Sequence, residues 1–414
     1  MNAPTPTFAR APIGFAEFVT FVASLMAINA MGIDIILPAL PAIGTSLGIA
    51  DENSRQLIIA CYMLGFGAMQ IVYGPLADRF GRRPVLLCGL LAFVATSLFA
   101  SFATDFLTIV AARTLQGMTA ATSRVLAVSM VRDRFSGRQM ARVMSLTFIV
   151  FLAVPILAPT LGQMILYIAP WEAIFYALAI YGALVAVWGF FRIPETLHAE
   201  DRRAIAVRPL LEAARLVLTN RYSLGYTIAM TLLFAGLMGF IMSVQQIFYD
   251  VFRRPDIFTY VFALVASGMA VASFANSRIV ERLGTRFVSH WALIGFVTFG
   301  GLHTAWALAG LETVWSFSVF QTGQMMCFAL AASNFGAMAM EPVGHIAGTA
   351  SSIQGTASTI GGALLGLAIG QSFDGTTLPV AIGYLLLGLA SLTAVAITER
   401  GRLFRSHPVA QVEA

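Results

Sequence analysis

The stretch GPLADRFGRRP, residues 74–84, lies between two long apolar runs and is echoed by VERLGTR at residues 280–286. An acid, an arginine, a glycine and a second arginine recur in one register, with Asp78 and Glu281 separated by 203 positions. Polar loops can collect Arg and Gly by chance, but four matched positions favour a true repeat. Because 203 is about half of the 414 residues, the register predicts two parallel halves.

The composition excludes an ordinary soluble enzyme. Hydrophobic residues make up 58% of the chain, charged residues 11%, and the mean hydropathy is +0.82. Soluble domains contain roughly 45–50% apolar and about 25% charged residues. The chain therefore has too few charges to cover a water-exposed surface of its size.

The apolar residues fall into runs of the length that an α-helix needs to cross a membrane, roughly 20 residues. We predict an all-α integral membrane protein with twelve transmembrane helices. Their expected ranges are 14–40, 55–76, 84–104, 106–131, 141–167, 171–191, 222–249, 257–280, 286–309, 312–341, 347–371 and 376–398. The first run is too long for a cleaved signal peptide, so it is interpreted as a retained helix.

The basic residues set the expected orientation. All 25 are Arg, against 20 acids, which gives a net charge of +5. Twenty lie in loops or termini on one side of the alternating spans, and only Arg55, Arg253 and Arg254 lie on the other. The positive-inside rule therefore predicts that both termini are cytoplasmic. This distribution also argues against a nucleic-acid partner, and the short outer loops favour a transporter over a receptor.

The longest polar stretch, residues 192–221, divides the spans into six and six. We expect an N-terminal six-helix bundle at 1–191, a cytoplasmic linker at 192–221, and a C-terminal bundle with a short tail at 222–414. The substrate of such a repeat transporter lies between the halves near mid-membrane.

No catalytic or metal-binding pattern is found in the sequence. The three cysteines lie inside apolar runs, and the histidines lack metal-ligand spacing. Neither a Ser/His/Asp set nor a nucleotide-binding loop is present, so we expect no enzyme activity, no metal, no cofactor and no ATP-driven transport within this chain.

Several motifs resemble one known family. The 74–84 stretch resembles the loop motif of the major facilitator superfamily, and RTLQG at 113–117 resembles its fourth-helix motif. PILAPTLG at 155–162 resembles the fifth-helix motif of its proton-coupled antiporters, with Ala158 and Gln163 where that motif has glycines. DIILPALP at 34–41 and PETL at 194–197 are similar to the bicyclomycin/chloramphenicol-resistance branch of drug exporters.

The resemblance implies that the first loop is a conformational latch. Asp78, beside a helix N-terminus, gains from the helix dipole and would face the eleventh span near residues 346–349. Arg79 is expected to pair with Asp133 at the end of the fourth span. The other reading is a solvated loop that only sets topology. The latch residues are Gly74, Asp78, Arg79, Gly81, Arg82, Arg83 and Asp133.

Asp34 is the sharpest single candidate, because a carboxylate in hydrocarbon is costly and is functional by default. Arg113 lies at a similar depth in the fourth span and could hold Asp34 charged until a proton or substrate arrives. We therefore expect Asp34 and Arg113 to form the proton-coupling site. The alternatives are a helix-end Asp34 at the outer interface and an Arg113 that anchors backbone carbonyls.

Arg124 projects from the same face of the fourth span as Arg113, eleven residues further on. Glu17 is a possible partner at its depth. The alternative is a side chain that snorkels to the cytoplasmic interface. If Arg124 faces the cavity, anionic or neutral polar substrates become more plausible than cationic ones.

The substrate wall should be apolar, aromatic and adaptable. Phe234, Met238 and Met242 recur every four residues as one stripe, and Met suits varied ligands. Interhelical or lipid-facing packing explains such residues equally well. The expected substrate-binding residues are Tyr62, Gln70, Gln116, Arg124, Phe234, Met238, Met242 and Gln245. Pro155, Pro159 and Gly162 are expected to bend the fifth span and control opening.

Together these features predict a monomeric inner-membrane transporter that exports lipophilic drugs or related small molecules in exchange for protons by alternating access. The first alternative is a proton-coupled metabolite or sugar exporter of the same fold. A membrane enzyme lacks a convergent catalytic set, and a channel would need neither paired loops nor a buried Asp and Arg.

Overall fold

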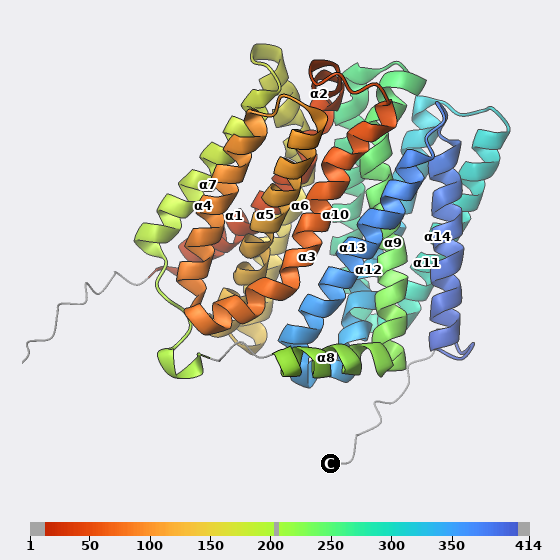
Figure 1. Cartoon of the computed structure of the whole chain (residues 1–414). Coiled ribbons are helices and arrows are strands. Elements are labelled where there is room, and N and C mark those ends of the chain that lie inside the picture. Colours follow the sequence, from red (N-terminus) through yellow and green to blue (C-terminus); the bar gives the residue numbers. More distant parts are fainter. Residues whose placement is uncertain (1–12, 203–206, 405–414) are drawn as a thin grey trace, which may run out of the picture.

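The computed structural model describes residues 13–202 and 207–404, and no strand occurs among them. Twelve helices of 20 to 32 residues run side by side through the molecule (Figure 1). The first six are α1 (Phe15–Asp34), α3 (Leu57–Phe80), α4 (Arg82–Ser101), α5 (Phe106–Arg134), α6 (Gly137–Ile168) and α7 (Glu172–Arg192). The second six are α9 (Arg221–Gln246), α10 (Phe258–Leu283), α11 (Thr285–Leu308), α12 (Val314–Met340), α13 (Ala347–Gln371) and α14 (Leu378–Thr398). The predicted all-α membrane fold is confirmed.

Short helical segments join or extend these twelve. They are η1 (Leu37–Ala39), α2 (Leu40–Ser46), η2 (Glu52–Gln56), η3 (Ala199–Asp201), α8 (Val207–Thr219), η4 (Ile247–Val251), η5 (Pro255–Ile257) and η6 (Glu341–Ile346). Among the described residues, nine continuous stretches are long and apolar enough to cross a membrane. One of them, Val314–Gln371, contains both α12 and α13, and α5 and α6 complete the set of twelve.

The helix contacts repeat between the two halves of the chain. In the first half α3 packs on α5, α4 on α7, and α1 on α6. The equivalent pairs in the second half are α10 on α12, α11 on α14, and α9 on α13. Gly81 and Gly284, which end α3 and α10, adopt matching backbone angles (φ 99, ψ 154 and φ 84, ψ 153). These positive φ angles favour glycine, so the loop register reflects a repeated turn.

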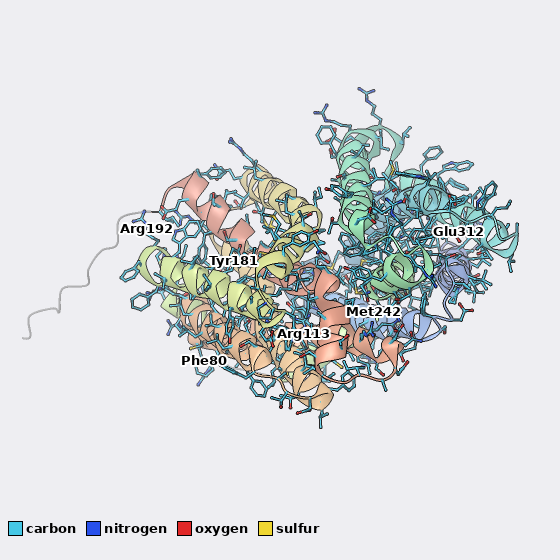
Figure 2. The ribbon with its side chains drawn as sticks, turned by 90° about the horizontal axis from the view of Figure 1, so that it is seen from above. Phe80, Arg113, Tyr181, Arg192, Met242 and Glu312 are labelled. Carbon is cyan, nitrogen blue, oxygen red and sulfur yellow. The ribbon has the colours of Figure 1, made fainter. Side chains whose placement is uncertain are left out.

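The two halves meet along two symmetric helix pairs, α3 with α13 and α6 with α10. Seen along the helices, they form two groups, with Arg113 in the first and Met242 in the second (Figure 2). The interface therefore pairs the second long helix of each half with the fifth long helix of the other half.

The expected polar linker contains an amphipathic helix that the sequence analysis missed. α8 lies across one end of the bundle, roughly perpendicular to the long helices (Figure 1). Ala213 and Val217 are buried against its neighbours, whereas Leu211 and Leu218 are exposed. We call this end the α8 face and the other end, which carries α2, the α2 face.

Candidate functional site

A cavity of about 830 Å³ lies between the halves and reaches the α8 face. Its walls come from α3, α5, α8 and the start of α13. Gln70 and Arg124 line its deep end, and both lie ten residues, or ~15 Å, inside the α8-face ends of their helices. The volume is in the range of sites that hold drug-sized molecules.

The α2 face is closed by side-chain amides that bridge the halves. Gln56 donates to Gln246 at 2.6 Å and to the Gly370 carbonyl at 2.9 Å. Gln371 donates to the Asn53 carbonyl at 2.7 Å. We call Asn53, Gln56, Gln246 and Gln371 the amide seal. With the cavity on the other side, the described residues form a conformation that opens towards the α8 face.

Gln70 links the two halves at the deep end of the cavity. Its amide nitrogen donates to Thr359 of α13 at 3.0 Å. Gly355, one turn earlier on α13, leaves room for the Gln70 side chain, since a Cβ there would lie 2.9 Å from its oxygen. A predicted substrate-wall residue therefore both lines the cavity and links the halves.

Asp34 is the last residue of α1, where the helix breaks. Pro38 has no N–H to bond the Asp34 carbonyl, and residues 35–36 form a turn before η1. The Asp34 side chain is 4% exposed, and no ion pair or hydrogen bond joins it to a described residue. The structure thus buries a carboxyl group without a charged partner.

Arg113 binds the backbone near Asp34 and forms no ion pair with its carboxyl group. Its guanidinium donates to the carbonyls of Gly32 at 2.8 Å and Ile58 at 3.1 Å. It also donates to Gln116 at 2.5 Å and lies 4.3 Å from the centre of the Tyr62 ring. The arrangement corresponds to the carbonyl-anchor alternative. The Asp34–Arg113 coupling role stays a prediction, with the two groups placed at the same level.

Glu17 is bound elsewhere, so the proposed Arg124–Glu17 pair is wrong. Arg192 at the end of α7 makes two hydrogen bonds of 2.7 Å to the two Glu17 oxygens, and Trp188 adds a third at 3.3 Å. A bidentate guanidinium satisfies the carboxylate fully. Arg124 instead lines the cavity.

The latch residues form a compact ion cluster in which Arg82, rather than Arg79, is central. Arg82 bonds Asp78 at 2.5 Å and Asp133 at 2.9 Å. The expected Arg79–Asp133 pair is therefore replaced, because Arg82 at the start of α4 is buried between both acids. Asp78 and the start of α13 both line the cavity, and no ion pair or hydrogen bond joins Asp78 to a described residue of α13, so this acid does not bridge the halves here.

Glu195 completes this cluster and was not predicted as a site residue. It accepts the backbone N–H groups of Arg82 at 2.8 Å and Arg83 at 3.2 Å. These are unpaired donors of the first turn of α4, where a carboxylate also gains from the helix dipole. Glu195 thereby ties the segment after α7 to the glycine turn at Gly81.

The second half carries a related cluster. Arg286 at the start of α11 bonds Glu399 at 2.9 Å and lies 3.7 Å from Glu341. Glu399 also accepts the Tyr226 hydroxyl at 2.5 Å, and its side chain is fully buried. The repeat offset of 203 applied to Glu195 leads to position 398, one residue short of Glu399. A repeat in exact register leads to Thr398, so this acid is reached from Glu195 only with a shift of one residue.

The other predicted wall residues do not line this cavity. Phe234 and Met238 pack against glycines of α13, and Met242 and Gln245 are buried in α9. Tyr62 and Gln116 are held by the Arg113 network, and Gln116 also donates to Ser97 at 2.7 Å. Their place on the substrate path stays a prediction for a conformation open at the α2 face.

Pro155 and Pro159 lie within the continuous helix α6, which contacts α1 and, across the interface, α10. Gly162 lets α6 approach the chain just after Asp34, because a Cβ there would overlap the Ile35 carbonyl oxygen. The predicted gating residues thus adjoin the break in α1, although their gating role stays a prediction.

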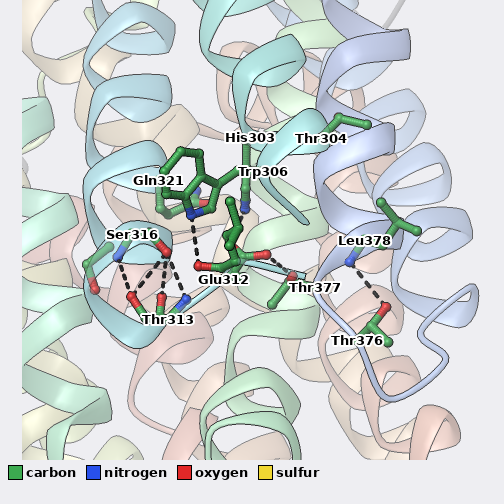
Figure 3. Close-up of polar contacts among 12 residues, drawn as sticks. His303, Thr304, Trp306, Glu312, Thr313, Ser316, Gln321, Thr376, Thr377 and Leu378 are labelled. Atoms are coloured by element: carbon green, nitrogen blue, oxygen red, sulfur yellow. Dashed lines mark hydrogen bonds and ion pairs between the residues drawn. The ribbon is translucent and has the colours of Figure 1, made fainter. Parts of the chain in front are cut away.

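A buried polar cluster near the α2 face of the second half was also missed. His303 contacts Glu312 at 2.6 Å through Nε2, and Glu312 accepts the Thr377 hydroxyl (Figure 3). The imidazole stacks on Phe320 at 5.2 Å. This cluster links the α11–α12 loop to the start of α14. It therefore stabilises the α2-face end of the second half, away from the cavity.

Comparisons with known proteins agree with a fold of two six-helix halves. Residues 22–366 match the family described as Major Facilitator Superfamily. A "Bicyclomycin resistance protein homolog" of Haemophilus influenzae is 30% identical over 88% of this chain and 91% of its own. "Multidrug resistance protein MdtL" of Escherichia coli is 28% identical over 84% of this chain and 87% of its own. A D-xylose-proton symporter structure, 15% identical, shares the fold with a TM-score of 0.72 over 92% of this chain and 97% of its own.

Proposed function

Because the chain belongs to the major facilitator superfamily, we propose that this membrane transporter exports lipophilic drugs or related small molecules in exchange for protons. The two relatives named above for bicyclomycin and multidrug resistance support drug-like cargo. We further propose a monomer in the cytoplasmic membrane, without a cofactor, powered by the proton gradient.

The α8 face is proposed to be cytoplasmic, since it carries the Arg-rich loops. The conformation would then be open to the cytoplasm and closed to the outside by the amide seal. Cargo would enter the cavity from the cytoplasm. Rocking of the halves would close the latch end against α13 and break the seal.

The observation that most supports proton coupling is the buried Asp34 carboxyl group, which has no cationic partner among the described residues. An isolated ionised carboxylate inside protein costs several kcal/mol, so ionisation would require water or a cation to reach it. Opening of the α2 face would bring in that water. Asp34 would thus exchange its proton only in certain conformations, which is the requirement for coupling.

The test is proton-driven transport by Asp34→Asn protein reconstituted in vesicles, with exposed Asp105→Asn as the matched control. We expect Asp34→Asn to bind cargo yet lose acceleration by an imposed pH gradient, while Asp105→Asn behaves as wild type. Undiminished gradient-driven transport by Asp34→Asn would remove this residue from the coupling role.

A proton-coupled metabolite exporter is the second candidate, favoured by the polar groups Gln70, Arg124 and Ser129 that line the cavity. A drug-susceptibility panel in an efflux-deficient host separates the two. Drug export predicts protection by wild type and loss of protection with Asp34→Asn. Protection against no compound would favour the metabolite exporter.

A further inference from the structure

Arg124 is a cation that the fold leaves without a partner deep in the cavity. It lies on α5, ten residues before the end of the helix at Arg134. Its side chain is exposed, and it lines the 830 Å³ cavity. No described carboxylate forms an ion pair or hydrogen bond with it. The exposed surface of Arg124 therefore opens into the space that cargo would occupy.

None of the described carboxylates that line the cavity forms an ion pair with Arg124. Asp78 and Asp133 are both bound to Arg82, whose side chain is buried between them. Asp201 belongs to the short helix η3 beside α8, at the cavity mouth. Arg132 lies two turns closer to the mouth than Arg124 on the same helix. Among the described residues that line the cavity, Arg124 is therefore a cation at the deep end that no carboxylate pairs with.

The surroundings of Arg124 suit an amphipathic molecule. Ile71, Val125 and Val128 supply apolar wall near it, and the Gln70 amide nitrogen already donates to Thr359. A guanidinium offers two parallel donors that match a carboxylate, phosphate or sulfonate. Because an unpaired charge inside a membrane protein is costly, a bound anion would offset that cost, whereas a bound cation would add repulsion.

We propose that Arg124 binds the anionic group of the cargo, so that the transporter selects amphipathic organic anions. The inference rests on the proposed transport function and specifies its substrate class. Arg113 plays no part in this selection, since its donors are occupied by Gly32, Ile58 and Gln116. The apolar wall would hold the body of the cargo while Arg124 holds its charge.

The experiment uses three probes with one aromatic body: naphthalene-2-carboxylate, its primary amide, and 2-naphthylmethylammonium. Binding to the purified full-length protein in lipid nanodiscs is measured by calorimetry. We expect wild type to bind the carboxylate at least tenfold more tightly than the ammonium. Arg124→Gln should weaken carboxylate binding at least tenfold and leave amide binding within threefold. Arg124→Glu should reverse the preference for charge.

Arg132→Gln is the matched control, because it removes the same charge from the same helix nearer the mouth. It should change carboxylate binding less than threefold. Equal or tighter binding of the ammonium by wild type, or no preferred binding of the carboxylate, would overturn the proposal. So would carboxylate affinity that Arg124→Gln leaves intact. Because the Asp34→Asn test concerns coupling, proton-driven export can stand even where anion selection fails.

Discussion

The guanidinium of Arg113 lies 4.3 Å from the centre of the Tyr62 ring and ties α5 to α3. The same guanidinium reaches α1 through the Gly32 carbonyl, two residues before Asp34. A single side chain thus holds three helices together at the level where α1 breaks. Arg124, eleven residues further along α5, forms no hydrogen bond or ion pair with a described residue of another helix. Two arginines of one helix therefore have opposite physical roles.

This contrast predicts opposite effects of removing each arginine. Arg113→Ala leaves buried carbonyls of α1 and α3 without their donor and should lower the free energy of unfolding by roughly 2–6 kcal/mol, at about 1–3 kcal/mol for each carbonyl. Arg124→Ala, its matched control on α5, should cost less than about 1 kcal/mol, since Arg124 has no partner among the described residues to lose. Thermal unfolding of both proteins in detergent measures the difference. Equal stability of the two variants would contradict the anchoring role.

The close approach of α6 to the broken end of α1 gives a second prediction. Gly162→Ala places a methyl group on the Ile35 carbonyl, which is backbone and cannot move aside. We expect transport to fall at least tenfold and the melting temperature to drop. Gly301→Ala on α11 is the control, because its nearest neighbour would be Leu385 at an ordinary 3.8 Å. Normal transport by Gly162→Ala would show that the helices separate there freely.

Removing the charge of Glu399 should lower the free energy of unfolding more than removing the charge of Glu195. Glu399→Gln removes a fully buried charge from Arg286 and should cost roughly 3–5 kcal/mol. Glu195→Gln affects mainly backbone N–H groups at a helix start and should cost about 1 kcal/mol. Denaturation of the two variants checks the order.

A double-mutant cycle refines this comparison. Arg286→Gln combined with Glu399→Gln should be less destabilised than the sum of the single variants, because the double variant leaves neither charge unpaired. Additive costs would mean that the two residues act independently, contrary to the 2.9 Å contact between them.

The spans and the repeat could be predicted from sequence because each depends on a linear signal. Apolar length marks a membrane helix, and the glycine turns at Gly81 and Gly284 require local backbone geometry that sequence records directly. α8 was missed because its apolar face occupies only 13 residues inside a charged linker. The mean hydropathy over a stretch as long as a membrane span does not reveal such a short apolar face.

The partners of the charged residues were harder to predict. Depth along a helix placed Arg113 near Asp34, but side-chain reach and helix rotation decided that it bonds Gly32. Similarly, Asp133 pairs with Arg82 and not with Arg79, because Arg82 begins α4 at a point between Asp78 and Asp133. The amide seal was not predicted, because its bonded partners lie 190 and 318 positions apart in the chain and only the packing of the two halves brings them together.

We expect the amide seal to stabilise the conformation that is closed at the α2 face over the one that is open there. Gln56 donates two hydrogen bonds across the interface and accepts another from Gln371 at 3.1 Å. At roughly 0.5–1.5 kcal/mol each, their loss in Gln56→Ala should favour opening of the α2 face by about 2 kcal/mol, a shift of about 30-fold. A cysteine at Ser352, in the cavity wall, would then react more slowly with a maleimide as the cavity closes. Labelling uses a background with Cys61, Cys88 and Cys327 replaced.

The control for this measurement is Asn334→Ala, which removes a buried amide whose bonds stay within the second half, to Asn276 at 2.8 Å and the Leu330 carbonyl at 2.8 Å. It should leave the labelling rate at Ser352→Cys within twofold. The same slowing in both variants would mean that loss of any buried amide disturbs the bundle. Slower labelling in Gln56→Ala alone would show that the seal sets the balance between the two conformations, because only that variant weakens contacts between the halves.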